Sequence, residues 1–536
     1  MLSLFSTLIL GLTLCMYGLS SGSSVSNGSP WPMPMSFTQT DEVVVMSGAE
    51  EFRFIAAGDT CNILEAAFKR YRNIIFYGTP ESSNWQKKST KNDHLGKLLA
   101  SSTLQNVAVT IKKCEDNEYP SLESDESYSL AVGDANSSII ANTIWGGLSG
   151  LETFSQLTYY NNDGMLVINK TTIQDSPRFS HRGLLVDTSR HFIKVPILLQ
   201  NLDAMAYNKL NVFHWHIVDM QAFPYESINF PSLSETGAYS PSHVYTQEDV
   251  ALVIEYARLR GIRVMPEFDT PGHTFNSWGS IKDLLTPCYS GDKPDGTFGP
   301  VNPTLNSTYD FLKSFMQEIT SVFPDHYIHL GGDEVNFKCW QSNPQITDFM
   351  KAQGFGSDYS KLEEYYEQKL LDIMSDLNSG YAVWQEVIDN NVKVRSDTVV
   401  EVWKTPYPGE MSAVTKKGYR TILSTPWYLN YLKSPYSNDW KDFYAIDPLL
   451  FNGTDAQKKL VIGGEVCMWG EFVDGTNLIP RLWPRASAVS ERLWSPQSVT
   501  SLDDAKIRIA EHRCRMVRRG LQVQPITGPG FCRVEF

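Results

Sequence analysis

The segment Tyr327–Glu334 reads Tyr-Ile-His-Leu-Gly-Gly-Asp-Glu, a short β-rich run that ends in two glycines and two carboxylates. From about residue 180 onward, runs of this kind alternate with helical patterns such as Val195–Tyr207, Gln247–Arg260, Leu305–Val322 and Lys361–Leu377. The other runs are Gly183–Ser189, Asn211–Asp219, Ile262–Asp269, Tyr381–Glu386, Thr398–Lys404, Arg420–Tyr428 and Leu460–Glu471. Eight strand–helix alternations predict a (β/α)8 TIM barrel, which we assign to residues 176–536 together with a C-terminal helix and tail.

Carboxylates and tryptophans gather where the predicted strands end. A barrel of this type carries its active site at the carboxyl ends of its strands. Five of the thirteen tryptophans lie at or near these ends, namely Trp215, Trp384, Trp403, Trp427 and Trp469. Because aromatic faces pack on the apolar faces of sugar rings, this rim favours carbohydrate chemistry.

Asp333 and Glu334 are the central pair of this rim. Neighbouring residues of a regular strand point to opposite faces, so both carboxylates reach one pocket only if the chain bends. Gly331 and Gly332 permit such a bend. Adjacent carboxylates are too close for an acid and a nucleophile from separate strands, and they suit one acid/base beside one group that steers a nucleophile within the substrate. An exposed Asp-Glu turn is the alternative interpretation.

Other chemistries are less well supported. His214 and His216 form an HxH pair that can bind zinc in other barrels, but no further ligands can be assigned, so we interpret them as hydrogen-bonded barrel histidines. The sequence contains neither a GxSxG elbow nor a GxxxxGK phosphate loop. We therefore expect no metal and no cofactor.

Composition excludes further classes. The chain has 536 residues, of which 60 are acidic and 46 are basic, and its net charge of −14 disfavours nucleic-acid binding. Residues 25–40 are rich in Ser, Pro and Gly and predict an irregular lead-in. Strand and helix patterns then predict a smaller α+β domain, within residues 25–175, in which no motif carries chemistry. These patterns are Val43–Met46, Cys61–Tyr71, Asn106–Ile111, Leu148–Leu157 and Leu166–Asn169.

The N-terminus and the cysteines indicate the secretory route. The first charged residue is Asp41, and the apolar stretch Leu4–Leu19 predicts a signal peptide over residues 1–24. No later stretch is long and apolar enough to predict a membrane span. Proximity in sequence suggests the disulfides Cys61–Cys114, Cys288–Cys339 and Cys514–Cys532, and it leaves Cys467 as a buried free thiol. Five sequons predict N-glycosylation at Asn27, Asn136, Asn169, Asn306 and Asn452.

The segment His329–Val335 resembles the catalytic signature of glycoside hydrolase family 20, the β-N-acetylhexosaminidases. Among the members of this family, the chain is most similar to the animal lysosomal β-hexosaminidase alpha and beta chains. The likeness extends over residues 40–536 through the flanking runs Asp187–His191, His214–Asp219, Glu267–His273, Trp384–Glu386, Pro426–Tyr428 and Trp469–Glu471. It implies an exo-acting enzyme that removes terminal GlcNAc or GalNAc with retention, through an oxazolinium intermediate formed by the substrate's own acetamido group.

The resemblance also implies roles for individual residues. Glu334 would be the general acid/base, Asp333 would orient the acetamido N–H, and Tyr428 would bind the acetamido oxygen. Trp384, Trp403 and Trp469 would line the pocket. Arg190 and Glu471 would hold the hydroxyls of the terminal sugar. Asp219 and His273 would fix the carboxylates.

Some positions depart from the family or discriminate within it. Met220 stands where the lysosomal chains carry a second Asp. Asn430 matches the alpha type, but Tyr431 replaces the Arg that follows there, so the positive partner for an O6-sulfated sugar is missing. The loop Gly291–Gly296 is nearer the alpha type, in which it helps to engage a ganglioside-presenting activator protein, and we leave that partner open. A homodimer and a lysosomal location are expected, with secretion, chitooligosaccharide substrates and a non-catalytic sugar-binding homologue as alternatives.

Overall fold

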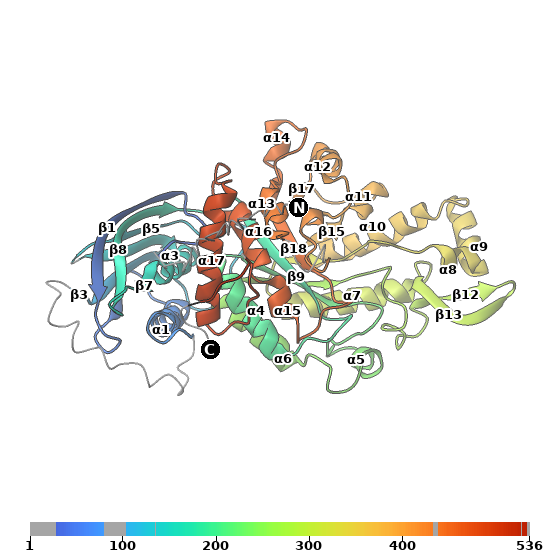
Figure 1. Cartoon of the computed structure of the whole chain (residues 1–536). Coiled ribbons are helices and arrows are strands. Elements are labelled where there is room, and N and C mark those ends of the chain that lie inside the picture. The colour runs from blue at the N-terminus through green and yellow to red at the C-terminus, as the bar shows by residue number, and fades with distance from the viewer. Residues whose placement is uncertain (1–27, 80–102, 135, 432–437, 527, 533–536) are drawn as a thin grey trace, which may run out of the picture.

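The computed structural model describes residues 28–79, 103–134, 136–431, 438–526 and 528–532. Within these residues a β-sheet domain and a closed parallel barrel lie side by side, and helix α17 (Leu502–Arg518) runs between them (Figure 1). The predicted fold class, a TIM barrel preceded by a smaller α+β domain, is therefore confirmed.

The first domain is built on a mixed sheet in the strand order β2-β4-β6-β5-β8-β1-β3, with β7 paired to β8. Helices α1 (Asn62–Tyr77) and α3 (Ile144–Leu157) pack on it toward the barrel (Figure 1). The strands are β1 (Ser36–Met46), β2 (Arg53–Ala56), β3 (Thr103–Leu104), β4 (Asn106–Lys113), β5 (Tyr128–Val132), β6 (Ser137–Thr143), β7 (Thr158–Tyr160) and β8 (Leu166–Asp175).

The irregular lead-in predicted for residues 25–40 is wrong from Ser36 onward, because strand β1 begins there. Its first residues pair with β8, with Ser36 opposite Gln174. The ladder satisfies the backbone of a polar segment whose composition alone favours a turn, so tertiary pairing outweighs the local signal.

Eight parallel strands close the barrel in chain order, with the last strand pairing with the first. Each lies within or overlaps one of the eight predicted runs. They are β9 (His181–Asp187), β10 (Val212–Val218), β11 (Arg263–Phe268), β14 (Tyr327–His329), β15 (Gly380–Trp384), β16 (Val399–Val402), β17 (Arg420–Leu423) and β18 (Val461–Met468).

Helices cover the outside of the barrel. The prediction for Val195–Tyr207 matches α4 at both ends, and the other three predicted helices match α6, α7 and α10 to within two residues at each end. The longer covering helices are α6 (Gln247–Arg258), α7 (Asn306–Val322), α10 (Ser360–Asp376), α12 (Tyr407–Lys416) and α16 (Arg485–Trp494). The remaining elements are α5 (Ser232–Gly237), β12 (Leu285–Ser290), β13 (Lys293–Val301), α8 (Lys338–Ser342), α9 (Pro344–Gln353), α11 (Glu386–Asp389), η2 (Thr425–Trp427), α13 (Trp440–Ala445), α14 (Asp455–Lys458) and α15 (Leu478–Leu482).

The fourth barrel strand is shorter than predicted. It ends at His329, whereas the prediction extended it to Glu334. Gly331 and Gly332 adopt φ angles of 72° and 88°, which lie in the left-handed region and end the extended backbone. The carboxylate pair is therefore carried by a loop at the mouth of the barrel.

The barrel interior beneath this mouth is polar and fully buried. His214 contacts Glu465 through Nδ1 at 2.5 Å and Glu267 through Nε2 at 3.0 Å. His329 lies 3.5 Å from Glu401 through Nε2. Buried charges are tolerated when they are paired, so these contacts explain how a barrel centre can hold several titratable groups.

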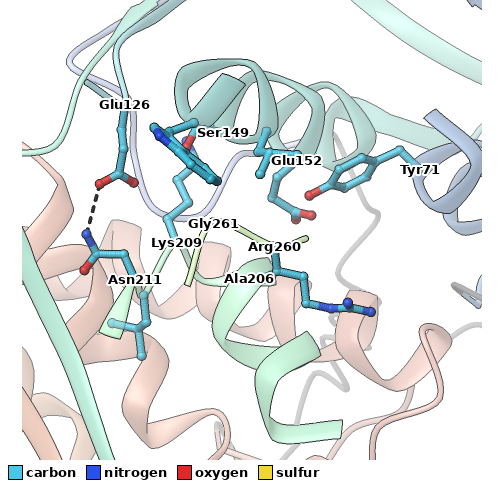
Figure 2. Close-up of a pocket in the computed structure, with 12 residues that line it drawn as sticks. Tyr71, Glu126, Ser149, Glu152, Ala206, Lys209, Asn211, Arg260 and Gly261 are labelled. Atoms are coloured by element: carbon cyan, nitrogen blue, oxygen red, sulfur yellow. Dashed lines mark hydrogen bonds between the residues drawn. The ribbon is translucent and has the colours of Figure 1, made fainter. Parts of the chain in front are cut away.

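The two domains meet over buried ion pairs. Arg519 of the segment after α17 contacts Glu152 of α3 at 2.8 Å, and Lys209 contacts Asp175 at 3.1 Å. Figure 2 shows a cavity at this interface, where the Asn211 amide of the barrel domain donates to Glu126 of the first domain at 3.0 Å. Its volume of about 30 Å³ is far below the several hundred Å³ of a typical ligand site, so it belongs to the domain contact and cannot hold a sugar.

The predicted cysteine chemistry is confirmed. Disulfides join Cys61 to Cys114, Cys288 to Cys339 and Cys514 to Cys532. Cys467 is free and buried in β18. The predicted signal peptide lies outside the described residues. None of the helices in the described part of the chain is both long and apolar enough to cross a membrane.

Candidate active site

The loop after β14 is held against the loop after β11. The Gly332 N–H donates to Asp269 Oδ1 at 3.0 Å. A Cβ atom on Gly331 would lie only 1.7 Å from the same oxygen, and its φ of 72° is unfavourable for any residue with a side chain. Gly331 is therefore required for the close approach of the two loops.

Gly331→Ala is expected to destabilise the protein and to lower its activity. The left-handed backbone alone costs about 1–2 kcal/mol for a non-glycine residue, and the clash with Asp269 adds to this. Gly354→Ala is the matched control, because Gly354 has a φ of 75° but no atom within 4 Å of an added Cβ. Thermal unfolding midpoints measure both variants. An equal fall for the two would contradict the close packing of Gly331.

Asp333 is buried in this loop. Its Oδ1 has no hydrogen-bond partner among the described residues and lies 3.9 Å from His273 Nδ1. Burial raises the pKa of Asp333 well above its usual range, and the Asp269 carboxylate raises it further against the opposing effect of His273. A buried acceptor with a free lone pair can bind a substrate N–H.

Glu334 differs from Asp333 in its exposure, its contacts and the direction of its pKa shift. Its side chain is 61% exposed, its backbone has a φ of 52°, and its Oε2 lies 3.6 Å from His273 Nε2. The contact with the charged imidazole of His273 holds the pKa of Glu334 below its usual range. The bend at the two glycines thus places one carboxyl inside the pocket and the other at its opening.

His273 connects the two carboxyls. Its Nδ1 bonds to Asp269 Oδ2 at 2.5 Å, while Nε2 faces Glu334. Burial alone would lower the pKa of His273, but the surrounding carboxylates, Asp269 foremost, raise it to about 12. The imidazole is therefore positively charged at neutral pH.

A second chain of contacts starts at Arg190, which follows β9. Arg190 contacts Asp187 at 3.0 Å and Asp219 at 2.8 Å, and its guanidinium lies over the Trp469 ring, 5.2 Å from the centroid. Asp219 in turn accepts from His216 Nε2 at 2.9 Å. These contacts fix the Arg190 side chain at the pocket wall.

Glu471 lies further out at this wall. It is exposed, and its charge is one of the influences that raise the pKa of Arg190. The guanidinium therefore stays charged and available to sugar hydroxyls together with this carboxylate.

The aromatic wall is made by Tyr428 and by the three tryptophans that the family resemblance assigned to the pocket. Trp384 and Trp469 have ring centroids 6.0 Å apart, Tyr428 lies 6.1 Å from Trp469, and Trp403 packs in the same cluster. The Trp384 indole N–H donates to Glu267 Oε1 at 2.9 Å, which fixes its ring. Burial raises the pKa of Tyr428 well above its usual range, so its hydroxyl remains a proton donor.

Trp215 and Trp427 do not belong to this wall. The Trp215 indole N–H donates to Thr188 and its ring packs on Tyr245, while Trp427 donates to the Phe443 carbonyl oxygen. Adjacent strand residues alternate between the two faces of the barrel, so a tryptophan beside an inward-pointing histidine points outward.

The histidine pair of β10 is hydrogen-bonded to carboxylates, as the interpretation of barrel histidines predicts. His216 Nδ1 bonds to Glu267 Oε2 at 2.6 Å, and His214 Nδ1 bonds to Glu465 Oε1 at 2.5 Å, while His214 Nε2 lies 3.0 Å from Glu267. Through these contacts Glu267 joins the two histidines to Trp384. The pair therefore supports the pocket from below.

Asn430 and Tyr431 flank the pocket beyond Tyr428. The Oδ1 atom of Asn430 is buried and has no hydrogen-bond partner among the described residues. Tyr431 is 67% exposed and stacks on Tyr428 with ring centroids 6.2 Å apart. Both residues thus offer polar groups next to the aromatic wall.

Three supporting residues were missed as site residues in the sequence. Asp269 and Glu267 end the third predicted strand, and Glu386 ends the fifth. Asp269 stands four residues before His273, a spacing that could have indicated their contact. Glu386 accepts the Glu334 N–H across the barrel mouth, a contact that no local pattern encodes.

Comparisons with known proteins identify related sequences and a related fold. The model of glycosyl hydrolase family 20, catalytic domain, matches residues 179–497, and a second, described as beta-acetyl hexosaminidase like, matches residues 30–157. Beta-hexosaminidase subunit beta of Homo sapiens is 54% identical over 94% of this chain and 90% of its own. Beta-hexosaminidase subunit alpha of Rattus norvegicus is 52% identical over 95% of both chains. A chitobiase structure from Flavobacterium johnsoniae superposes with a TM-score of 0.78 at 28% identity, covering 92% of this chain and 73% of that one.

Proposed function

The chain belongs to glycosyl hydrolase family 20, and we propose that it is an exo-acting β-N-acetylhexosaminidase that removes terminal GlcNAc and GalNAc from glycoconjugates. The observation that carries this proposal is the loop after β14, which buries Asp333 and exposes Glu334 at the mouth of the barrel. One carboxylate inside and one at the opening match a substrate-assisted reaction, in which the enzyme supplies an acid and an orienting group but no nucleophile.

The proposed reaction has two steps. Glu334 donates a proton to the glycosidic oxygen, while the substrate's acetamido oxygen attacks the anomeric carbon and displaces the aglycone. Asp333 accepts the acetamido N–H and stabilises the positive charge that develops in the oxazolinium ring. The Glu334 carboxylate then takes a proton from water, which opens the ring at the anomeric carbon with net retention.

The remaining residues are assigned to binding. Tyr428 donates to the acetamido oxygen, and Trp384, Trp403 and Trp469 enclose the acetamido methyl and the sugar ring. Arg190 and Glu471 bind the hydroxyls at the non-reducing end, which confines cleavage to terminal residues. His273 is assigned to hold Glu334, as expected from the sequence, whereas Asp219, which was expected to fix the carboxylates, is assigned to hold Arg190.

A chromogenic N-acetylglucosaminide assay at acidic pH tests the proposal. Turnover is expected, together with tight inhibition by a thiazoline analogue of the oxazolinium ion. Folded protein that binds the sugar without turnover would identify a non-catalytic homologue instead. A thiazoline that binds no better than GlcNAc would refute substrate assistance. Chitooligosaccharides in the same assay test the alternative of a chitin-directed enzyme.

Sulfated substrates are expected to be poor, and Tyr431→Arg is expected to improve them. Tyr431 offers no positive charge to an O6-sulfate, whereas a charge-assisted hydrogen bond contributes about 1.5–3 kcal/mol. Because the position is exposed, we expect a rise of only about tenfold in the ratio of kcat/KM for sulfated over neutral substrate.

The matched control for this exchange is Tyr431→Gln, which removes the ring without adding charge. Its ratio is expected to equal that of the unaltered enzyme. The gain with arginine should also shrink at high ionic strength, because exposed charge interactions are screened. A similar gain with glutamine would show that the tyrosine ring, and not the missing charge, limits sulfated substrates.

We assign residues 1–24 to a signal peptide, 25–175 to the N-terminal domain and 176–536 to the catalytic domain of a lysosomal protein, with secretion as the alternative. Asn136, Asn306 and Asn452 are exposed, as glycan attachment requires. The Asn169 amide nitrogen donates to the Thr40 carbonyl oxygen at 2.8 Å, so a glycan there would disturb this contact. Asn27 lies outside the described residues.

A homodimer is the proposed assembly, which light scattering would test. An activator protein is a further candidate partner.

A further inference from the structure

The general acid proposed above sits on a backbone that needs support. Glu334 adopts a φ of 52°, and two glycines with positive φ precede it. This left-handed conformation is unfavourable for a residue with a Cβ atom and persists only where the surroundings hold it. Because φ sets the direction of the Cα–Cβ bond, relaxation at this residue would swing the carboxyl away from the leaving oxygen.

One side chain from a neighbouring strand end holds this backbone. The Oε2 atom of Glu386 accepts the Glu334 N–H at 3.1 Å. The other oxygen, Oε1, contacts Lys404 Nζ at 2.8 Å. The Glu386 side chain is 18% exposed and that of Lys404 is 36% exposed, so solvent competes only in part with this bridge.

Both ends of the bridge are fixed to the barrel. Glu386 opens α11 directly after β15, and Lys404 follows β16. Between them, the Gln385 Oε1 atom accepts the backbone N–H groups of Trp403 at 3.1 Å and Lys404 at 2.9 Å. The ends of β14, β15 and β16 are thereby joined next to Glu334 at the rim of the barrel.

We propose that Glu386 is a positioning residue that orients the general acid Glu334 by hydrogen-bonding its backbone N–H, with Lys404 holding the Glu386 carboxylate in place. This inference rests on the proposed function, because it assigns Glu334 the role of acid. Glu386 need not touch substrate to act in this way.

The effect of Glu386 is expected to depend on the leaving group. A methoxyphenyl aglycone needs a proton to depart, whereas a dinitrophenyl aglycone leaves without one. A misplaced acid therefore slows only the first substrate. Glu386→Ala is expected to lower kcat/KM for the methoxyphenyl N-acetylglucosaminide by about 10–100-fold, in line with the cost of a small misplacement, and to leave the dinitrophenyl substrate within about threefold.

Charge provides the competing explanation. Glu386 also helps to raise the pKa of Asp333, so its loss could act on the acetamido step instead. That step is needed for every aglycone, and an equal fall on both substrates would overturn the proposal. Glu386→Asp separates the two causes further, because it keeps the charge but withdraws the acceptor from the Glu334 N–H. It is expected to reproduce the selective loss.

Asp389→Ala is the matched control for both variants. Asp389 belongs to the same short helix and lies 3.7 Å from Lys404, but it makes no contact with Glu334 among those the structure describes. Its variant is expected to match the unaltered enzyme on both substrates. Thermal unfolding midpoints and thiazoline affinity confirm an intact pocket, and the milder Glu386→Asp carries the test if Glu386→Ala fails to fold. Absence of turnover in the unaltered enzyme would refute the proposed function and with it this inference, whereas turnover with an equal loss on both substrates would overturn this inference alone.

Discussion

Glu334→Gln is expected to lower kcat/KM for a methoxyphenyl N-acetylglucosaminide about 1,000-fold, within the range that general acid catalysis contributes. Glutamine has nearly the same size but carries no proton that it can transfer to the glycosidic oxygen. The side chain is mostly exposed, so the exchange disturbs little packing. Steady-state kinetics on purified protein measure the loss, with the thermal unfolding midpoint as the control for folding.

The same variant is expected to lose far less activity on a dinitrophenyl substrate, about tenfold at most, because that aglycone departs without a proton. This comparison separates an acid from a binding group. A loss that is equal for both aglycones would mean that Glu334 binds the sugar rather than protonates the leaving group. Glu386→Ala is expected to show the same selectivity at a smaller amplitude, because it only displaces the acid.

The barrel could be predicted from sequence because its signal is repeated and local. β-rich runs alternate with helical patterns along the chain, and eight such runs specify the architecture even where single boundaries are wrong. The errors lie where tertiary contacts decide. Ser36–Thr40 becomes a strand through pairing with β8, and the strand before Asp333 ends early because two glycines turn the chain.

The site was predictable only in part, for a related reason. Residues at the ends of strands were identified, but lying near a strand end does not decide which of them enter the pocket. Trp215 and Trp427, two of the five tryptophans counted near strand ends, lie outside the aromatic wall. Glu386 and Glu334 are neighbours in space through a bond to a backbone N–H. Such a bond places no constraint on the identity of Glu334 and leaves no local pattern between the two segments.

The pKa shifts of Asp333 and Glu334 favour the opposite arrangement of protons to the one that the proposed mechanism needs. That mechanism requires Asp333 as a carboxylate and Glu334 as an acid, yet the pKa of Asp333 is raised by burial and that of Glu334 is lowered by His273. We expect bound substrate to reverse both pKa shifts. In the proposed complex the acetamido N–H would stabilise the Asp333 carboxylate, and the sugar would bury Glu334 and so favour its neutral form. Binding energy would thereby set the protonation states of the pair.

Asp333→Asn is expected to lower kcat/KM by about 100–1,000-fold, the range for loss of one group that stabilises developing charge. Asparagine keeps an oxygen that can accept the acetamido N–H, but it cannot offset the positive charge of the oxazolinium ring. Since every aglycone depends on that ring, the methoxyphenyl and dinitrophenyl substrates are expected to fall equally. A selective loss on the methoxyphenyl substrate would place Asp333, rather than Glu334, on the leaving-group side.

The pH profile of the same variant tests the arrangement of protons. In the unaltered enzyme the pair carries one proton over the range between its two pKa values, so kcat/KM is expected to be bell-shaped. Removing Asp333 leaves Glu334 as the titrating member, and only its protonated form can act as acid. Residual kcat/KM is therefore expected to lose its acidic limb and to fall as pH rises through the lowered pKa of Glu334. If the pH profile of the variant stays bell-shaped, a group other than Asp333 must supply one of the two titrations, and His273 is the nearest candidate.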